Sequence, residues 1–219
     1  SPREWAQELQ AAVEDHNRST EDRLRALEAL QVYGPQPSRS RLTKLMGDAD
    51  PKVRAQAVFL LGTFPLEQIR TPLTEALQDH DPLVARRACE ALVRAGLSAD
   101  SVVLPSKELW QNLLMLDDED RFTRYAARLA LQRCHKGKWP EAVFADSIEK
   151  RPRGALEGLL ALIMTAETQS DSDAIFAKLQ TFDPAAIDAE TLLDYLRVIS
   201  LAYIRDKAPS DGENDPLTA

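Results

Sequence analysis

The side chains that could do chemistry in this sequence are few and lie far apart. Covalent haem attachment requires two cysteines separated by two residues and followed by a histidine. The nearest approach is residues 131–135, where Leu131 stands in place of the first cysteine. The two cysteines, Cys89 and Cys134, lie in apolar helical patterns, where a thiol usually packs as a small hydrophobic group.

The three histidines, His16, His80 and His135, do not have the spacing of a metal site. We expect His80 to lie in a turn beside a helix cap and His135 to lie at a solvated helix end. The sequence also lacks the spacing of a Ser-His-Asp triad, a glycine-rich phosphate loop or a catalytic carboxylate pair. The sequence therefore predicts no catalytic residue, no cofactor and no metal ion, and we expect this segment not to be an enzyme.

Composition favours helices. The 219 residues include 44% hydrophobic, 28% charged and 6% aromatic side chains, and helix formers such as Ala, Leu, Glu and Arg are abundant. The longest apolar run, residues 158–164, is too short to cross a membrane. The net charge of -8 has the wrong sign for wholesale nucleic-acid binding, and residues 165–219 carry -7 of it. We expect neither membrane nor nucleic acid as a partner.

An internal repeat predicts how these helices are arranged. Asp50, Asp81 and Asp120 each precede an apolar pattern with Ala seven residues on and Leu eleven residues on, at intervals of 31 and 39 residues. The aspartate can accept the free N–H groups of a helix start, and the third, seventh, tenth and eleventh residues after it share one helix face. We predict antiparallel pairs over 3–17 with 20–33, 38–47 with 51–64, 66–78 with 82–95, 106–116 with 119–134, 140–150 with 152–167, and 171–182 with 188–206.

A single helix pair cannot bury both of its faces, so neighbouring pairs must stack. The predicted fold is therefore all-α, a right-handed α-solenoid (alpha-alpha superhelix) of about five to six helix pairs. Residues 1–206 would form this single domain, and the polar residues 207–219 would be a disordered tail or linker. Pro140, Pro152, Asp188 and either Ser170 or Asp171 are expected at helix starts.

The repeated motifs resemble the HEAT family, specifically the short bacterial, phycobilisome-lyase-type repeats. The resemblance rests on Asp-x-Asp-Pro-x-Val-Arg at 48–54, Asp-His-Asp-Pro-Leu-Val at 79–84 and residues 120–131. Residues 120–131, Trp139, 154–162 and 192–198 also resemble the HEAT region of large exported bacterial proteins that carry a propeller-type dehydrogenase and a c-type haem module. That resemblance implies an interior domain of a multidomain, periplasmic or exported protein; without it, a cytoplasmic location is expected.

The same family includes an enzyme alternative. The alkylpurine DNA glycosylases are HEAT-like proteins of nearly this length, and the resemblance implies a basic face carrying Trp, Asp and Arg. Trp110, Asp120 and Arg124 are present, but Asp120 is already explained as a helix cap and the chain is acidic.

Residues 121–153 have a local net charge of +6. This region is either a solvated face or a patch for an acidic partner, such as the C-terminal quarter of the chain. Arg54 and Arg124 are also candidates to bridge to cap aspartates of adjacent repeats.

Helix geometry points to one candidate interaction surface. If the repeated apolar positions face the core, the second, fifth and ninth residues after each aspartate point the other way. Large apolar side chains at such positions, together with neighbouring arginines at the rim, have the make-up of a protein-recognition surface. An apolar stripe widened by contacts between neighbouring helices would instead place these side chains in the core. The candidates are Phe59, Arg86, Arg87, Arg121, Phe122, Tyr125, Arg128 and Leu129.

These observations predict a non-catalytic scaffold or interdomain spacer that binds a protein partner, or another domain of its parent chain, on this face. We expect the segment to be monomeric. A HEAT-like nucleic-acid enzyme is the alternative.

Overall fold

The computed structural model describes residues 2–96, 114–134, 139–145, 150–166 and 169–207. Every element within these residues is a helix, which confirms the all-α prediction. The eleven helices are α1 (Pro2–Glu14), α2 (Thr20–Tyr33), α3 (Arg39–Leu45), α4 (Pro51–Leu61), α5 (Leu66–Ala76), α6 (Pro82–Gly96), α8 (Arg121–Arg133), α9 (Trp139–Ala145), α10 (Pro152–Thr165), α11 (Gln169–Leu179) and α12 (Ala189–Lys207).

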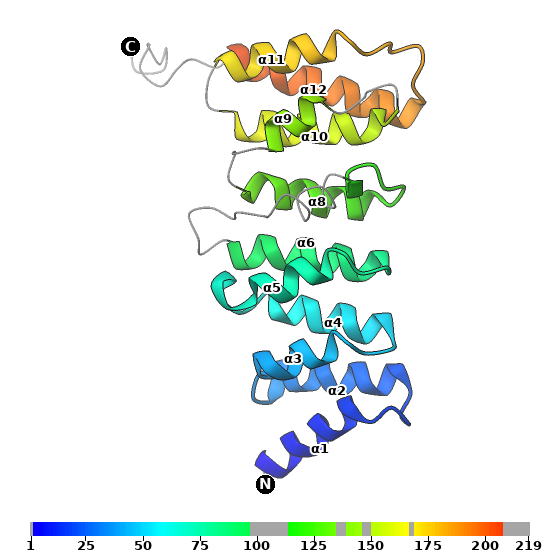
Figure 1. Ribbon diagram of the computed structural model, residues 1–219, viewed down its shortest axis with the longest axis vertical. Coiled ribbons are helices and arrows are strands. Elements are labelled where there is room, and N and C mark those ends of the chain that lie inside the picture. The colour runs from blue at the N-terminus through cyan, green and yellow to red at the C-terminus, as the bar shows by residue number, and fades with distance from the viewer. Residues whose placement is uncertain (1, 97–113, 135–138, 146–149, 167–168, 208–219) are drawn as a thin grey trace, which may run out of the picture.

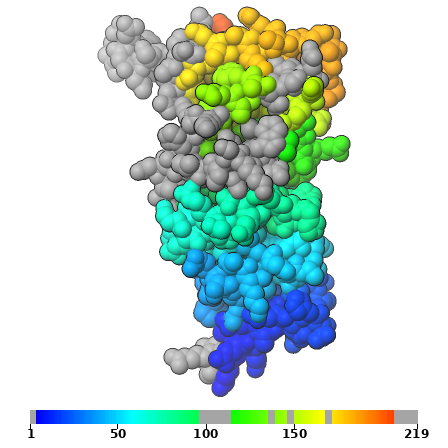
Figure 2. All heavy atoms as spheres, in the orientation of Figure 1, coloured from blue at the N-terminus to red at the C-terminus, as the bar shows by residue number. Residues whose placement is uncertain are grey.

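The helices stack in two layers. Helices α1, α3, α5, α9 and α11 each pack on the helix that follows them in the chain. Helices α2, α4, α6, α8, α10 and α12 contact one another in that order, and we call them the second-helix layer. The stack is elongated, with α1 at one end and α11 and α12 at the other (Figure 1). In the space-filling view, successive stretches of the sequence occupy successive levels along the long axis (Figure 2). The protein is an α-solenoid, as the repeats predict.

Aspartates begin the helices of the second layer where the repeats place them. Asp50, Asp81 and Asp120 each accept a hydrogen bond from the backbone N–H two residues along, at 2.8 to 3.2 Å. Asp188 likewise accepts the N–H of Thr191 at 2.8 Å before α12. These side chains satisfy donors that a helix start leaves without an intrahelical partner.

Helix α10 is capped differently. The residue before it, Arg151, makes no capping hydrogen bond. Asp117, in the turn that precedes α8, accepts the N–H of Gly154 at 2.8 Å instead. The start of α10 is thus stabilised by a residue 37 positions earlier in the chain.

The repeated apolar positions form the core. In α4, Val53, Ala57, Leu60 and Leu61 are buried, and the corresponding residues of α6 and α8 are buried as well. Each helix of the second layer packs against neighbours before and after it, so its buried stripe is wide. Ala55 of α4, which the sequence predicted to point outward, is buried for this reason.

A glycine allows α4 and α6 to approach closely. A Cβ atom at Gly62 would lie 2.8 Å from the Cα of Ala91 and 2.9 Å from its Cβ. Such distances are too short for non-bonded carbons, so only glycine fits at this contact.

A proline inside α5 leaves a carbonyl that the preceding repeat satisfies. Pro72 has no N–H to donate to the carbonyl of Gln68, four residues before it. Arg39 of α3 donates from Nη1 to that carbonyl oxygen at 2.9 Å. The proline is therefore accommodated by a contact between neighbouring first-layer helices.

Some predicted boundaries are wrong. Helix α1 ends at Glu14 instead of residue 17, because the carboxylate of Asp15 accepts the N–H of Asn17 at 3.0 Å and starts a turn. Helix α11 begins at Gln169, so Ser170 and Asp171 lie within its first turn instead of preceding it. Trp110, His135 and the predicted tail from residue 208 onward lie outside the described residues.

Buried arginines join successive repeats along the second-helix layer. Arg23 of α2 pairs with Asp48, and Arg54 of α4 pairs with Asp79, each acid lying in the turn before the next second-layer helix. Helix α6 has Ala85 at the corresponding position, and the neighbouring Arg86, which is less buried, pairs with Asp120 at 3.4 Å instead. The predicted bridge from Arg54 is thus present, although Asp79 lies two residues before the capping aspartate.

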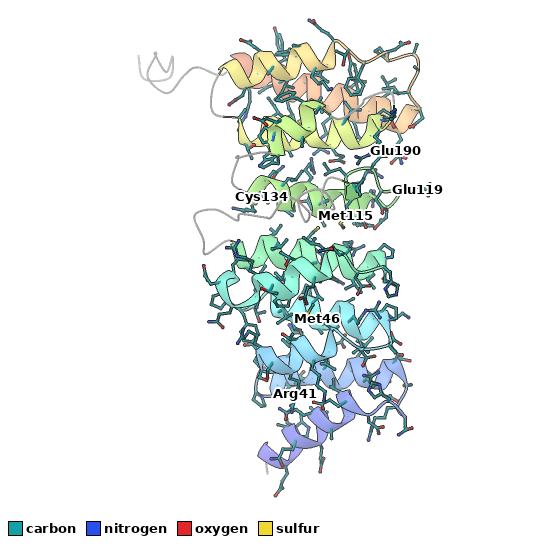
Figure 3. All side chains as sticks on the ribbon, viewed as in Figure 1. Arg41, Met46, Met115, Glu119, Cys134 and Glu190 are labelled. Carbon is teal, nitrogen blue, oxygen red and sulfur yellow. The ribbon has the colours of Figure 1, made fainter. Side chains whose placement is uncertain are left out.

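Arg124 of α8 occupies the same helix position but reaches farther. Its Nη2 donates to Oε1 of Glu190 at 3.0 Å, and its Nε lies 3.8 Å from Oε1 of Glu157. Glu190, the second residue of α12, lies at the same edge of the stack as Glu119, just before α8 (Figure 3). Arg124 therefore ties α8 to α10 and α12 instead of to a capping aspartate.

Candidate interaction surface

Two aromatic side chains of α8 are exposed on the second-helix layer. Phe122 and Tyr125 expose 54% and 52% of their surface, one helical turn apart. Leu129, a further turn along, is half-buried, and Phe59 of α4 is half-buried and packed against the core. Of the two positions that the sequence left open, the rings of α8 take the outside one, whereas Phe59 lies partly in the core and partly at the surface.

Phe59 lies between two arginines of α6. The guanidinium carbon of Arg94 is 3.9 Å from the centroid of the ring, and that of Arg87 is 5.0 Å away. Arg94 also donates from Nη1 to the carbonyl of Phe59 at 3.1 Å, and burial lowers the pKa of Arg94. Arg87 is held from the other side by Glu90, at 2.5 Å. These contacts fix the ring of Phe59 across the α4–α6 junction.

Phe122 is the centre of a second Arg–aromatic group. The guanidinium carbons of Arg86 and Arg121 lie 5.5 Å and 4.8 Å from its ring centroid. Arg86 is positioned by Glu90 at 3.1 Å and by the capping residue Asp120 at 3.4 Å. Arg121 is exposed and has no ion pair with any described residue. A positive charge over a ring face is attracted by the ring quadrupole, so both arginines favour this arrangement.

Tyr125 and Arg128 form the third group. The guanidinium carbon of Arg128 is 5.2 Å from the ring centroid of Tyr125. Arg128 was predicted as a rim residue, but its side chain is only 7% exposed, because it reaches toward Glu157 of α10 at 3.3 Å. Burial lowers the pKa of Arg128 and raises that of Glu157, each against the attraction between them. Arg128 makes no hydrogen bond within the described part of the chain, and its Nε is a buried unpartnered donor.

The structure thus brings seven of the eight predicted residues into three Arg–aromatic groups that run across α4, α6 and α8. Leu129 joins them only as a neighbour on α8. The sequence interpretation missed Arg94 and Glu157. Arg94 lies seven residues after Arg87 and hence on the same helix face, and Glu157 is the one charge in the apolar stretch 154–162; both signals are present in the sequence.

Residues 39–132 match the family model of HEAT repeats. This match includes α3, α4, α5, α6 and nearly all of α8, and so covers the three Arg–aromatic groups. No curated protein sequence is detectably similar to the chain.

Several solved structures resemble the chain at low sequence identity. An engineered protein is 17% identical, with 90% of this chain and 97% of that chain covered and a TM-score of 0.49. A designed armadillo repeat protein in complex with the peptide (KR)4 is 14% identical, with coverages of 92% and 98% and a TM-score of 0.45. Human deoxyhypusine hydroxylase in complex with glycerol is 16% identical, with coverages of 93% and 97% and a TM-score of 0.37.

Two residues that the nucleic-acid enzyme alternative would use have other roles in this structure. Asp120 caps α8, accepting N–H groups of Phe122 and Thr123, and these hydrogen bonds outweigh burial and lower its pKa. Arg124 is buried in contacts with Glu157 and Glu190. None of the described helices has the length and apolar character needed to cross a bilayer.

Proposed function

We propose that this segment is a non-catalytic scaffold that binds a protein partner, or another domain of its parent chain, on the exposed side of the second-helix layer. The observation that carries the proposal is the exposure of Phe122 and Tyr125 beside Arg86 and Arg121. Aromatic and arginine side chains dominate the energetics of protein interfaces, where they anchor the centre of the contact.

The surroundings of these rings support a binding role. Phe122 and Tyr125 lie on one face of a helix that is packed on both sides, so the surface is displayed on a rigid support. The arginines hold the rings through their charge without covering them, which leaves apolar area for a partner to bury. Repeat solenoids present such extended surfaces along the stack.

Site-specific photo-crosslinking tests the proposal. A benzophenone amino acid is placed at Tyr125 and, as a matched control, at Tyr33, an exposed tyrosine on α2. In extract of the native source, the expected result is a discrete adduct at position 125 that unlabelled protein competes away. Equal adducts at both positions, or none at position 125, would contradict a binding face on α8.

A finer part of the proposal concerns the parent protein. The resemblance of residues 120–131 and 154–162 to HEAT regions of exported multidomain proteins supports a location outside the cytoplasm. Fractionation of native cells with an antibody against this segment tests it. Recovery from the cytoplasm would contradict the exported parent.

A further inference from the structure

We infer that the Arg–aromatic surface of α6 and α8 recognises an acidic peptide segment, whose carboxylates are received by Arg121 and Arg128 beside the rings of Phe122 and Tyr125. This inference rests on the proposed function and specifies the chemistry of the partner.

The charge of these two helices differs from that of the rest of the chain. Helices α6 and α8 together carry seven arginines and a single acidic residue, Glu90, in a chain whose net charge is -8. Arg124 is turned into the stack, but the other six arginines lie on or beside the Arg–aromatic groups or at the end of α8. A positive patch on an acidic protein selects partners of negative charge and orients their approach.

Two guanidinium groups of the patch have unused donors. Among the described residues, neither Arg121 nor Arg128 has a hydrogen-bond acceptor. Arg128 is nine-tenths buried, and its one ion-pair partner, Glu157, is shared with Arg124. The buried unpartnered donor of Arg128 is Nε, which faces Oε2 of Glu157 at 3.3 Å inside the stack, so an incoming carboxylate would be received by the terminal nitrogens of this guanidinium. An arginine can also bind a carboxylate through two parallel hydrogen bonds.

The spacing of the two arginines limits the sequence of the peptide. Arg121 and Arg128 are two turns apart on α8, so their Cα atoms are separated by about 10 Å along the helix. Three residues of a polyproline II segment span about 9 Å, and because this conformation has three residues per turn, every third side chain points to the same face. The rings of Phe122 and Tyr125 lie between the two arginines in the helix and offer apolar area to the intervening residues. The preferred segment therefore has an acidic residue at every third position and an aromatic residue between.

A peptide fits this surface better than a nucleic acid does. Toward the N-terminal end of the stack the basic field ends within two levels, because α2 exposes Glu21, Asp22 and Glu28. A phosphate backbone long enough to use the patch would meet these like charges, whereas a short acidic segment would not.

Fluorescence anisotropy tests the inference with a labelled peptide of repeating Glu-Ala-Trp. Peptides of repeating Lys-Ala-Trp and single-stranded DNA of matched length are the comparison ligands. The expected result is saturable binding of the Glu-Ala-Trp peptide only, with Arg121→Glu weakening it at least about tenfold. Lys52→Glu, which makes the same charge change at an exposed position of α4, is the matched control and should have little effect.

Three outcomes would overturn the inference. Equal weakening by Arg121→Glu and Lys52→Glu would show attraction by overall charge, without a site. Comparable binding of the DNA would assign the patch to phosphate. If the peptide does not bind but a partner is still crosslinked at position 125, the acidic ligand is wrong and the proposed scaffold function stands. If no partner is crosslinked at position 125, the scaffold function itself is wrong.

Discussion

Arg54 donates two hydrogen bonds to Asp79, from Nε to Oδ2 and from Nη2 to Oδ1, each 2.9 Å long. The remaining nitrogen, Nη1, donates to the carbonyls of Asp48 and Ala49 at 3.0 and 3.2 Å. One side chain thus joins the turn that begins its own helix to the turn that begins the next. Because both partners are nearly buried, solvent screens this link little.

Replacing Arg54 should therefore be costly. Arg54→Ala leaves Asp79 buried without its charged partner, and we expect the free energy of unfolding to fall by about 3 kcal/mol. Arg25→Ala removes an exposed ion pair with Glu21 on α2 and should cost less than about 1 kcal/mol. Urea unfolding of the two variants and the wild type measures both values. Equal losses would mean that the Arg54 pair adds nothing beyond a surface contact.

The same link makes stability depend on pH. Burial alone would raise the pKa of Asp79, but hydrogen bonds from Arg54 and from the N–H of Asp81 outweigh it and lower the pKa. The resulting stability is present above the unfolded pKa of about 3.9 and is lost as the pH falls through the folded pKa. Asp79→Asn should therefore be less stable than the wild type at pH 6, with a difference that shrinks below about pH 4. Urea titrations across this range measure it, and a constant difference would contradict the assignment.

The contact between α4 and α6 predicts an unusual response to Gly→Ala. Within helices, alanine is normally more stable than glycine by up to about 1 kcal/mol. At Gly62 the added Cβ would meet the backbone of Ala91, so we expect Gly62→Ala to destabilise the protein by about 2 kcal/mol. Gly47→Ala, whose Cβ would lie 3.4 Å from the carbonyl of Lys44, is the control and should be close to neutral. Thermal unfolding measures the stability of both variants against the wild type. A stabilised Gly62→Ala would show that α4 and α6 move apart at little cost to admit the methyl group.

The two cysteines provide a probe of the intact stack. Cys89 and Cys134 are buried, and burial raises the pKa of Cys134 to about 12. Because the thiolate is the reactive form, neither cysteine should react with a chromogenic disulfide reagent at neutral pH until the protein is unfolded. Thiol titration with and without urea tests this. Rapid labelling of one thiol in native buffer would reveal local opening of the helix that carries it.

The sequence predicts the local features of this fold better than its connections between repeats. The caps Asp50 and Asp120 and the buried Ala57 and Ala127 follow from a pattern within each helix, and the structure confirms them. The cap of α10 by Asp117 could not be predicted, because it depends on how two repeats lie against each other.

In the candidate surface too, features within one helix are easier to predict than contacts between repeats. Helix periodicity points Phe122 and Tyr125 away from the repeated apolar positions but leaves a core position open, and the structure shows both rings exposed. Periodicity alone does not show that Arg128 is buried, because its burial is produced by Glu157 on the next helix of the layer. Isolated charges in apolar stretches, such as Glu157, are the signal that could identify such pairs.

Tyr125 separates a binding role from a structural one. Because half of its side chain is exposed, Tyr125→Ala should lower the free energy of unfolding by less than about 1 kcal/mol. Phe59→Ala, which removes a ring packed against the core and held by Arg87 and Arg94, should cost about 2 to 3 kcal/mol. If Tyr125 is an anchor, its truncation should weaken partner binding by about 2 kcal/mol, roughly 30-fold. Parallel urea unfolding and partner titrations of the two variants measure both effects. A large loss of stability in Tyr125→Ala with unchanged affinity would assign the ring to the core, because truncating a binding anchor must weaken partner binding more than it lowers the free energy of unfolding.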